Sequence, residues 1–230
     1  MALKDRITEV HSQGEGAACL SSINEKIGTD MHPFTCVLYD MRSMLDESEK
    51  VYLEIGAYRG NSSALMLSHP RPTKVIAVDC CNLTHFGRPQ SQEIKANIEK
   101  ICGPSGLTNF TLYEGMSSSK SLLDRLRREV GFGGVDILFI DGDHSRGGVL
   151  SDWVNYRSLV KPGGYIIFDD YSDSVYSPEV KVAVDEIVAS CAPGTIEVAG
   201  CIDNVNGLTL PSGVRYTDPS VGNDFIIRMM

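Results

Sequence analysis

The sequence has too few basic residues to favour a polyanionic partner, since 30 aspartates and glutamates outnumber its 21 lysines and arginines. The resulting net charge of −9 argues against a nucleic acid or an anionic membrane as the main partner, because both require a basic surface. Long apolar runs are also missing. No stretch approaches the length of a transmembrane helix, and the N-terminus lacks the apolar segment of a signal peptide. We therefore expect a cytoplasmic protein.

Two common motifs are absent as well. The seven cysteines include no C-x-x-C pair and no zinc-like spacing, which favours reduced thiols over a disulfide framework or a structural zinc site. No G-x-G-x-x-G follows a predicted strand, and this disfavours a nicotinamide dehydrogenase. The length of 230 residues and the hydrophobic content of 42% indicate one globular domain, or one domain with a cap.

Apolar runs alternate with amphipathic segments through most of the chain. Seven runs are predicted to be strands: Val51–Ile55, Lys74–Val78, Phe110–Tyr113, Val135–Ile140, Tyr165–Phe168, Thr195–Ala199 and Asp224–Arg228. Helical segments follow each of the first five, which indicates a parallel sheet, whereas no helix separates the last two, which we expect to be antiparallel neighbours. Residues 1–48 contain helix-like segments at Ala17–Ile27 and Phe34–Leu45. The prediction is an α/β fold with a Rossmann-like, doubly wound, seven-stranded sheet that is mostly parallel with an antiparallel terminal strand. The sheet domain would comprise residues 49–230, and residues 1–48 would form an N-terminal helical cap.

A glycine turn follows the first predicted strand. It begins at Gly56, ends at Gly60 and leads through Asn61 and Ser62 into a helix, so that backbone N–H groups and a helix N-terminus could meet a ligand. Glu54 lies within the strand itself, where a carboxylate is costly without a partner. A ligand cation or ammonium group would supply that partner.

The second and third predicted strands also end in residues suited to a ligand. Asp79 follows the second strand, where an acid can hydrogen-bond the hydroxyls of a ribose, although a turn or helix-cap role explains it equally well. Gly115, Met116 and Ser117 follow the third. The methionine could pack against a flat heterocycle, and a serine here could also cap the next helix.

Four aspartates follow the fourth and fifth predicted strands. Asp141 and Asp143 come after the fourth, with His144 beside them, and Asp169 and Asp170 come after the fifth. Ligands bind at the carboxyl ends of parallel strands, so these acids indicate an oxygen-ligand metal site or an acid/base site. One acid of the last pair could instead be a cap.

These motifs together resemble those of the class I S-adenosylmethionine-dependent methyltransferases, from about residue 49 to the end. The resemblance rests on the segments LEIGAYRGNSS, VIAVD, YEGMSS, VDILFIDGDH and LVKPGGYIIFDD. The part from IDGDH to FDDY is similar to a branch of metal-dependent O-methyltransferases that act on sugar moieties of natural products, with the catechol-type enzymes as more distant relatives.

The resemblance implies S-adenosylmethionine as cofactor and Mg²⁺, or another divalent cation, held by Asp141, Asp169 and Asp170. Asp143 matches the general base of that branch, and His144 would be a second base or a cofactor contact. A histidine that caps a helix or packs at the edge of the core is the alternative for His144. The implied cofactor-binding residues are Glu54, Gly56, Gly60, Asn61, Ser62, Asp79, Gly115, Met116, Ser117 and Asp141. Among them, Glu54 would compensate a charged part of the cofactor and Asp79 would bind its ribose.

The implied reaction is methylation of a hydroxyl on a small molecule, either a sugar or an acceptor with vicinal hydroxyls, as in a catechol. A cation that binds two such hydroxyls lowers the pKa of one and fixes its approach. A metal-independent methyltransferase of the same fold and a non-catalytic cofactor-binding protein are the alternatives. Acceptor choice would fall to the cap and to loops at residues 81–90, 171–178 and 203–222, and the capping helices are compatible with a homodimer.

Overall fold

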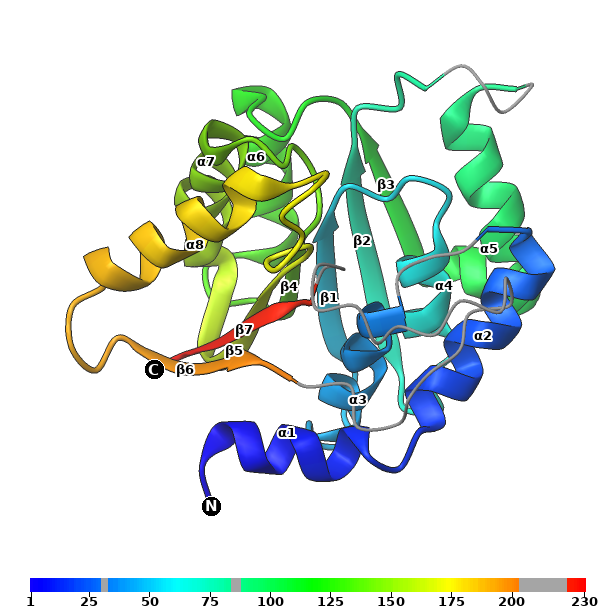
Figure 1. The fold of residues 1–230 in the computed structure, drawn as a ribbon. Helices are drawn as coiled ribbons and strands as arrows, with labels where there is room; N and C mark the ends of the chain where they lie inside the picture. The colour runs from blue at the N-terminus through cyan, green and yellow to red at the C-terminus, as the bar shows by residue number, and fades with distance from the viewer. Residues whose placement is uncertain (30–32, 84–87, 203–222) are drawn as a thin grey trace.

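The protein is built on one seven-stranded sheet with the strand order β3-β2-β1-β4-β5-β7-β6 (Figure 1). The computed structural model describes residues 1–29, 33–83, 88–202 and 223–230. The strands are β1 (Lys50–Ile55), β2 (Thr73–Asp79), β3 (Phe110–Glu114), β4 (Val135–Ile140), β5 (Val160–Phe168), β6 (Ile196–Cys201) and β7 (Phe225–Met229). Strands β1 to β5 are mutually parallel, and β7 lies antiparallel between β5 and β6. The predicted fold class is therefore confirmed, as is the antiparallel pairing of the last two strands.

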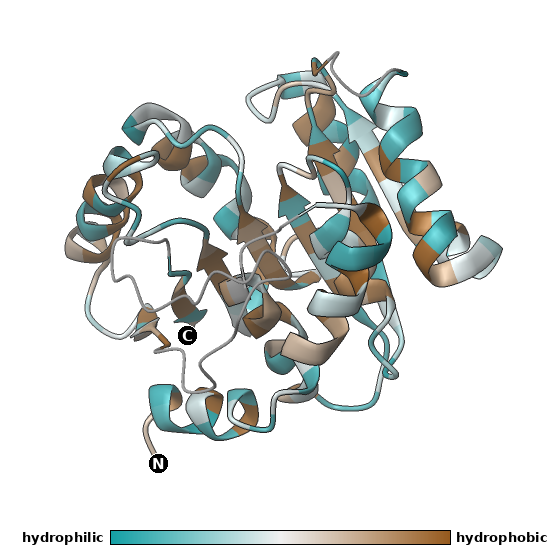
Figure 2. Ribbon diagram, turned by 45° about the vertical axis from the view of Figure 1, so that its right-hand side comes forward, coloured by the Kyte–Doolittle hydropathy of each residue, from teal (hydrophilic) through white to brown (hydrophobic). Residues whose placement is uncertain are grey.

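Helices cover both faces of the sheet. They are α1 (Leu3–His11), α2 (Glu15–Ile27), α3 (Val37–Ser43), α4 (Asn61–Leu67), α5 (Gln90–Thr108), α6 (Lys120–Val130), α7 (Arg146–Tyr156) and α8 (Pro178–Ser190), with short 3₁₀ turns η1 (Pro33–Cys36) and η2 (Arg157–Leu159). One buried apolar cluster joins the sheet to α1–α5, and a second joins the other face to α6–α8. Figure 2 shows the hydrophobic residues concentrated on the strands between these helical layers.

The local sequence explains why these elements form. All six residues of β4 are buried, as expected for a central parallel strand covered on both faces. In α6 the side chains of Leu122, Leu123 and Leu126 are buried at helical spacing. The backbone of α5 is not helical at Gly103 (φ 70°), so this helix consists of two helical pieces.

The N-terminal helices pack directly on the sheet. Leu3 and Ile7 of α1 and Leu20 of α2 belong to the same buried cluster as residues of β1 and β4. Helix α1 was not among the predicted helices, because its apolar residues are few and widely spaced. Among the described helices, none has both the length and the apolarity needed to cross a lipid bilayer. The division of the chain at residue 48 stays a prediction.

The strand register brings the polar strand ends to one edge of the sheet. Ile55 of β1 pairs with Val78 of β2 and with Ile140 of β4, and Ile140 in turn pairs with Phe168 of β5. Strand β7 runs the other way, so that its first residue, Phe225, pairs with Phe168. Residues that follow β1, β2, β4 and β5 therefore meet residues that precede β7.

Candidate functional site

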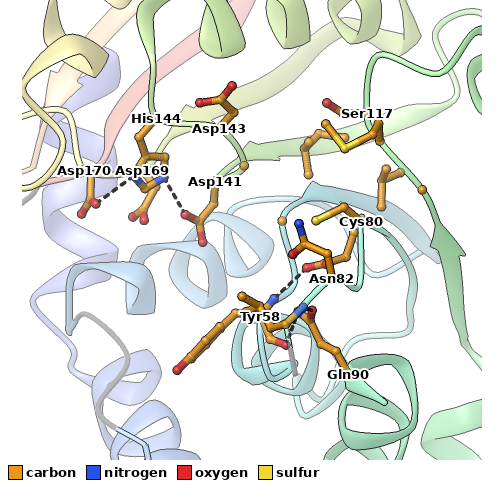
Figure 3. A pocket seen from close by; sticks show the side chains of 18 of the residues that line it. Tyr58, Cys80, Asn82, Gln90, Ser117, Asp141, Asp143, His144, Asp169 and Asp170 are labelled. Carbon is orange, nitrogen blue, oxygen red and sulfur yellow. Dashed lines mark hydrogen bonds and ion pairs between the residues drawn. The ribbon is translucent and has the colours of Figure 1, made fainter. Parts of the chain in front are cut away.

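A cavity of about 550 Å³ opens at this edge of the sheet (Figure 3). Its volume is in the range of pockets that hold cofactors and drug-sized ligands. Of the predicted site residues, those that line it are Gly56, Asn61, Asp79, Gly115, Met116, Ser117, Asp141, Asp143, His144, Asp169 and Asp170. Lining residues that the sequence did not single out are Thr29, Ile55, Tyr58, Val78, Cys80, Asn82, Leu83, Gln90 and Gly142. In Figure 3 the acidic group lies at one end, and Cys80, Asn82 and Ser117 lie away from it.

The turn after β1 requires glycine at its first position. A Cβ atom on Gly56 would lie 1.8 Å from the backbone carbonyl oxygen of Asp141, and the φ angle of Gly56 is +90°. Only glycine accepts both this contact and this backbone conformation without strain. Gly60 (φ +85°) precedes α4 in a left-handed conformation and does not line the cavity.

Glu54 is held by hydroxyl groups of the chain itself. Its fully buried carboxylate accepts hydrogen bonds from Tyr52 (2.8 Å), Ser62 (2.7 Å) and Ser63. Burial raises the pKa of Glu54 to about 7, against the opposing effect of these hydrogen bonds. Neither Glu54 nor Ser62 lines the cavity. The partners of this carboxylate are therefore internal hydroxyls, where the sequence had suggested a ligand cation.

Asp79 joins the end of β2 to the glycine turn. Its Oδ2 accepts hydrogen bonds from the backbone N–H groups of Ala57 (2.8 Å) and Tyr58 (3.0 Å), and its Oδ1 accepts one from Cys81 (2.7 Å). The same side chain also lines the cavity. The two readings of Asp79, as a turn residue and as a ligand-facing acid, are thus compatible in one geometry.

Asn61 connects the cap to the cavity. Its Nδ2 donates to Oδ1 of Asn24 (2.9 Å) and to Oγ1 of Thr29 (2.8 Å), both in the N-terminal segment. Thr29 itself lines the cavity. The cap therefore contributes to the wall of this site. Of the loop at residues 81–90, predicted to select the acceptor, Asn82, Leu83 and Gln90 line the cavity as well. Residues 84–87 of that loop and the whole predicted loop 203–222 lie outside the described residues.

The segment after β3 forms a more open wall. Met116 is 60% exposed, so it is available to a ligand surface. The carbonyl oxygen of Ser117 accepts a hydrogen bond from the hydroxyl of Tyr156 (2.8 Å), which holds this segment against α7. The residue at the N-cap of α6 is Ser119, which leaves Ser117 in the cavity wall.

His144 lies between two aspartates at the acidic end. Its Nε2 is 3.1 Å from Oδ1 of Asp141, and its Nδ1 is 2.8 Å from the hydroxyl of Ser177 and 3.3 Å from Oδ2 of Asp170. Because that hydroxyl donates to Asp170 (2.8 Å), it accepts from Nδ1 of His144. Nδ1 therefore carries a proton. Nε2, which faces Asp141, is the nitrogen that can take up a second proton or bind a metal ion.

The three predicted metal ligands do not all lie together, and neither do the two predicted bases. Ligand atoms of Asp141, His144 and Asp169 all lie within 4.8 Å of one another. The carboxylate of Asp170 instead bonds to Ser177 beside His144, and its residue has a left-handed backbone (φ 54°). Figure 3 shows the Asp143 carboxylate directed away from this group, and its Oδ1 accepts from the backbone N–H of Ser145 (2.9 Å). His144, unlike Asp143, therefore lies beside Asp141 and Asp169.

The acidic end has the properties of a cation site. Burial raises the pKa of Asp141 and of Asp169 well above the ordinary range, and neighbouring carboxylates, Asp170 among them, raise both further. Oδ1 of Asp169 has no hydrogen-bond partner among the described residues. A divalent cation would relieve this repulsion, and two carboxylates with an imidazole suit Mg²⁺, Mn²⁺ or a related ion. The residues present therefore fit the implied metal.

One acid of this region was missed at the level of the sequence. Asp224 precedes β7, is 3% exposed, and has its pKa raised well above the ordinary range by burial and by the charge of Asp169. In the sequence it was only the first residue of a predicted strand. Antiparallel pairing of that strand with β5 would have indicated its place, because the residue before β7 then lies opposite the residue after β5.

Comparison with known proteins agrees with this geometry. The family model described as a methyltransferase domain matches residues 53–171. An uncharacterized protein, R132, of Acanthamoeba polyphaga mimivirus is 31% identical over 209 residues, which cover 88% of this chain and 90% of that protein.

Two solved structures share the fold. An O-methyltransferase from Bacillus cereus in complex with SAH has a TM-score of 0.57 at 14% identity, covering 92% of this chain and 90% of that one. The MycE methyltransferase of the mycinamycin biosynthetic pathway, in complex with Mg, SAH and mycinamycin VI, has a TM-score of 0.55 at 16% identity, covering 91% of this chain and 54% of that one. With the family match over more than half of its length, the chain belongs to the methyltransferase-domain family and is a class I S-adenosylmethionine-dependent methyltransferase.

Proposed function

We propose that the protein methylates a hydroxyl group of a small molecule that carries two adjacent hydroxyls, with the assistance of a divalent cation. The observation that carries this proposal is the convergence of Asp141, His144 and Asp169, whose ligand atoms lie within 4.8 Å of one another in the wall of the cavity. A cation there faces the same space as the cofactor, so acceptor and methyl donor can meet.

The cofactor would supply the methyl group, and the cation would bind and acidify the acceptor hydroxyl. The chain positions both. Asp79 would offer its carboxylate to the ribose, and Gly56, whose lack of a side chain lets the turn approach the backbone of Asp141, lines the same cavity. Close, oriented binding of two reactants supplies much of the rate enhancement in such transfers.

His144 is the proposed base, so its Nε2 would receive the proton, and Asp141 and Asp169 would hold the cation. The Nδ1 of His144 is engaged with Ser177 and lies near Asp170, which orients the ring and leaves Nε2 toward Asp141 and the cavity. A base must reach the proton that it removes, and this nitrogen lies among the ligand atoms where the acceptor oxygen would bind. Asp143, the base implied by the sequence motif, remains the alternative.

Three observations support a small acceptor with vicinal hydroxyls. The net charge of −9 disfavours a polyanionic substrate. A cluster of oxygen ligands can chelate such an acceptor through its cation. MycE, which shares this fold, is described in complex with Mg, SAH and mycinamycin VI.

The test is release of S-adenosylhomocysteine by EDTA-treated protein with a catechol or a vicinal sugar diol, compared with the matching monohydroxy compound. We expect turnover of the diol only after Mg²⁺ or Mn²⁺ is restored. Full activity in EDTA would contradict the role of the cation. His144→Gln should abolish turnover while Asp143→Asn, its matched neighbour, should retain it; the reverse result would make Asp143 the base.

A further inference from the structure

The residue Asp224 lies beside the proposed cation site, although it belongs to a different strand. In the antiparallel pair β5–β7, Phe168 is opposite Phe225, so Asp169 and Asp224 are opposite each other. Phe168 and Phe225 pack into one face of the sheet, and alternation along a strand turns the next residue to the other face. Both aspartates therefore point to the same face, as does Asp141, which follows Ile140 of the first face.

Asp224 has no counter-charge within the described part of the chain. It is 3% exposed, and neither of its carboxylate oxygens accepts a hydrogen bond from an N–H group or a hydroxyl there. The group against which it lies is another acid, Asp169, whose Oδ1 also lacks such a donor. The charged groups nearest to Asp224 are acids, Asp169 and Asp170, and its charge also acts on Asp141. A buried carboxylate without a partner costs several kcal/mol.

We propose that Asp224 is a third carboxylate of the cation site, contributed by the residue that precedes β7. This inference rests on the proposed function, since it concerns a further ligand of the same ion. A bound divalent cation would supply the positive charge that Asp169 and Asp224 lack, and hard cations take six or more oxygen ligands. Asp141, Asp169 and Asp224 would then hold the cation from the ends of β4 and β5 and the start of β7.

Binding of Mn²⁺ to the EDTA-stripped full chain tests the proposal without requiring a methyl acceptor. Free Mn²⁺ is measured by its electron paramagnetic resonance signal during a titration. We expect Asp224→Asn, which keeps the shape of the side chain, to weaken Mn²⁺ binding by at least about 10-fold, the effect typical of ligands and their immediate partners. Asp141→Asn should abolish binding.

Asp152→Asn is the matched control. Asp152 is also a buried acid whose oxygens have no hydrogen-bond partner among the described residues, but it lies on α7, outside the cation cluster. It should leave Mn²⁺ binding unchanged. Thermal melts in metal-free buffer verify folding, and Asp224→Ser replaces Asp224→Asn if the latter fails to fold.

The outcomes separate the two proposals. If Asp224→Asn binds Mn²⁺ as tightly as the parent while Asp141→Asn does not bind, Asp224 is no ligand and the proposed function stands. If the parent chain binds no Mn²⁺, both the cation-assisted function and this inference are overturned. Equal weakening by Asp224→Asn and Asp152→Asn would show a general response to the loss of a buried acid and would also refute the assignment.

Discussion

Glu54 should make the stability of this protein depend on pH in a way that one substitution removes. Its carboxylate is fully buried, and burial raises its pKa from the ordinary value of 4.5 to about 7. The folded state therefore binds this proton more tightly than the unfolded state does. The stabilisation from the neutral acid is fully present below pH 4.5 and is lost as the pH rises through 7.

The size of the effect follows from the two pKa values. Their difference corresponds to about 3 kcal/mol of unfolding free energy, lost between acidic and mildly alkaline pH. Glu54→Gln removes the titration but keeps a side chain of the same shape beside the hydroxyls of Tyr52, Ser62 and Ser63. The parent should therefore lose about 3 kcal/mol relative to the variant over this range.

Urea unfolding at a series of pH values measures this difference. Glu99 is an exposed residue of α5, so Glu99→Gln is the control for replacing a glutamate that is not buried. Subtraction of the variant curve from the parent curve isolates Glu54, because the other buried acids are common to both. The difference in unfolding free energy between parent and variant should change with pH. A difference that stays constant from pH 4.5 to 8, or that grows in favour of the parent, would refute a raised pKa of Glu54.

Three further substitutions test the glycine turn after β1 and its hydrogen-bond partners. Gly56→Ala would place a Cβ atom 1.8 Å from the carbonyl oxygen of Asp141, so we expect calorimetry to show no S-adenosylhomocysteine binding and melting to occur earlier; parent-like binding would contradict that close approach. Asp79→Asn should weaken the same binding by at least about tenfold, since hydrogen bonds to a charged group contribute roughly 1.5–3 kcal/mol, and an unchanged affinity would remove Asp79 from the site. Ser62→Ala takes one donor from Glu54 and should lower the unfolding free energy by roughly 1.5–3 kcal/mol at pH 8, with a smaller loss at pH 5; equal losses at both would argue against an ionised partner.

Much of the fold follows from local patterns in the sequence. Apolar runs such as that of β4, and the leucines of α6, have periods that identify strands and helices without tertiary information. The insertion of β7 between β5 and β6 is set by packing between distant segments, and no local period encodes it. Helix α1 escaped prediction for a related reason, because it is stabilised by burial of only a few residues against the sheet.

The site was predictable where it depends on strand ends. Parallel strands deliver Gly56, Asp79, Asp141 and Asp169 to one edge, so their proximity follows from topology alone. Side-chain direction does not follow from position in a motif. Glu54, Gly60 and Ser62 belong to the sequence motif around the glycine turn, yet they do not line the cavity.

The acidic end shows the same limit. Asp143 and His144 are adjacent in the chain, but only His144 turns toward Asp141 and Asp169. Asp170 lies next to Asp169, yet its carboxylate is engaged by Ser177. Asp224 came from an antiparallel strand that local patterns could not place. Each difference arises from tertiary contacts that a linear motif does not contain.

The most direct test is a crystal structure with S-adenosylhomocysteine and Mn²⁺, whose ion is located by anomalous scattering. We expect the ribose at Asp79, the adenine near Met116 and Ser117, and one Mn²⁺ peak between the carboxylates of Asp141, Asp169 and Asp224. A cofactor bound outside this cavity, or a cavity that holds the cofactor with no Mn²⁺ peak beside these residues, would contradict the account of a cation-assisted methyltransferase.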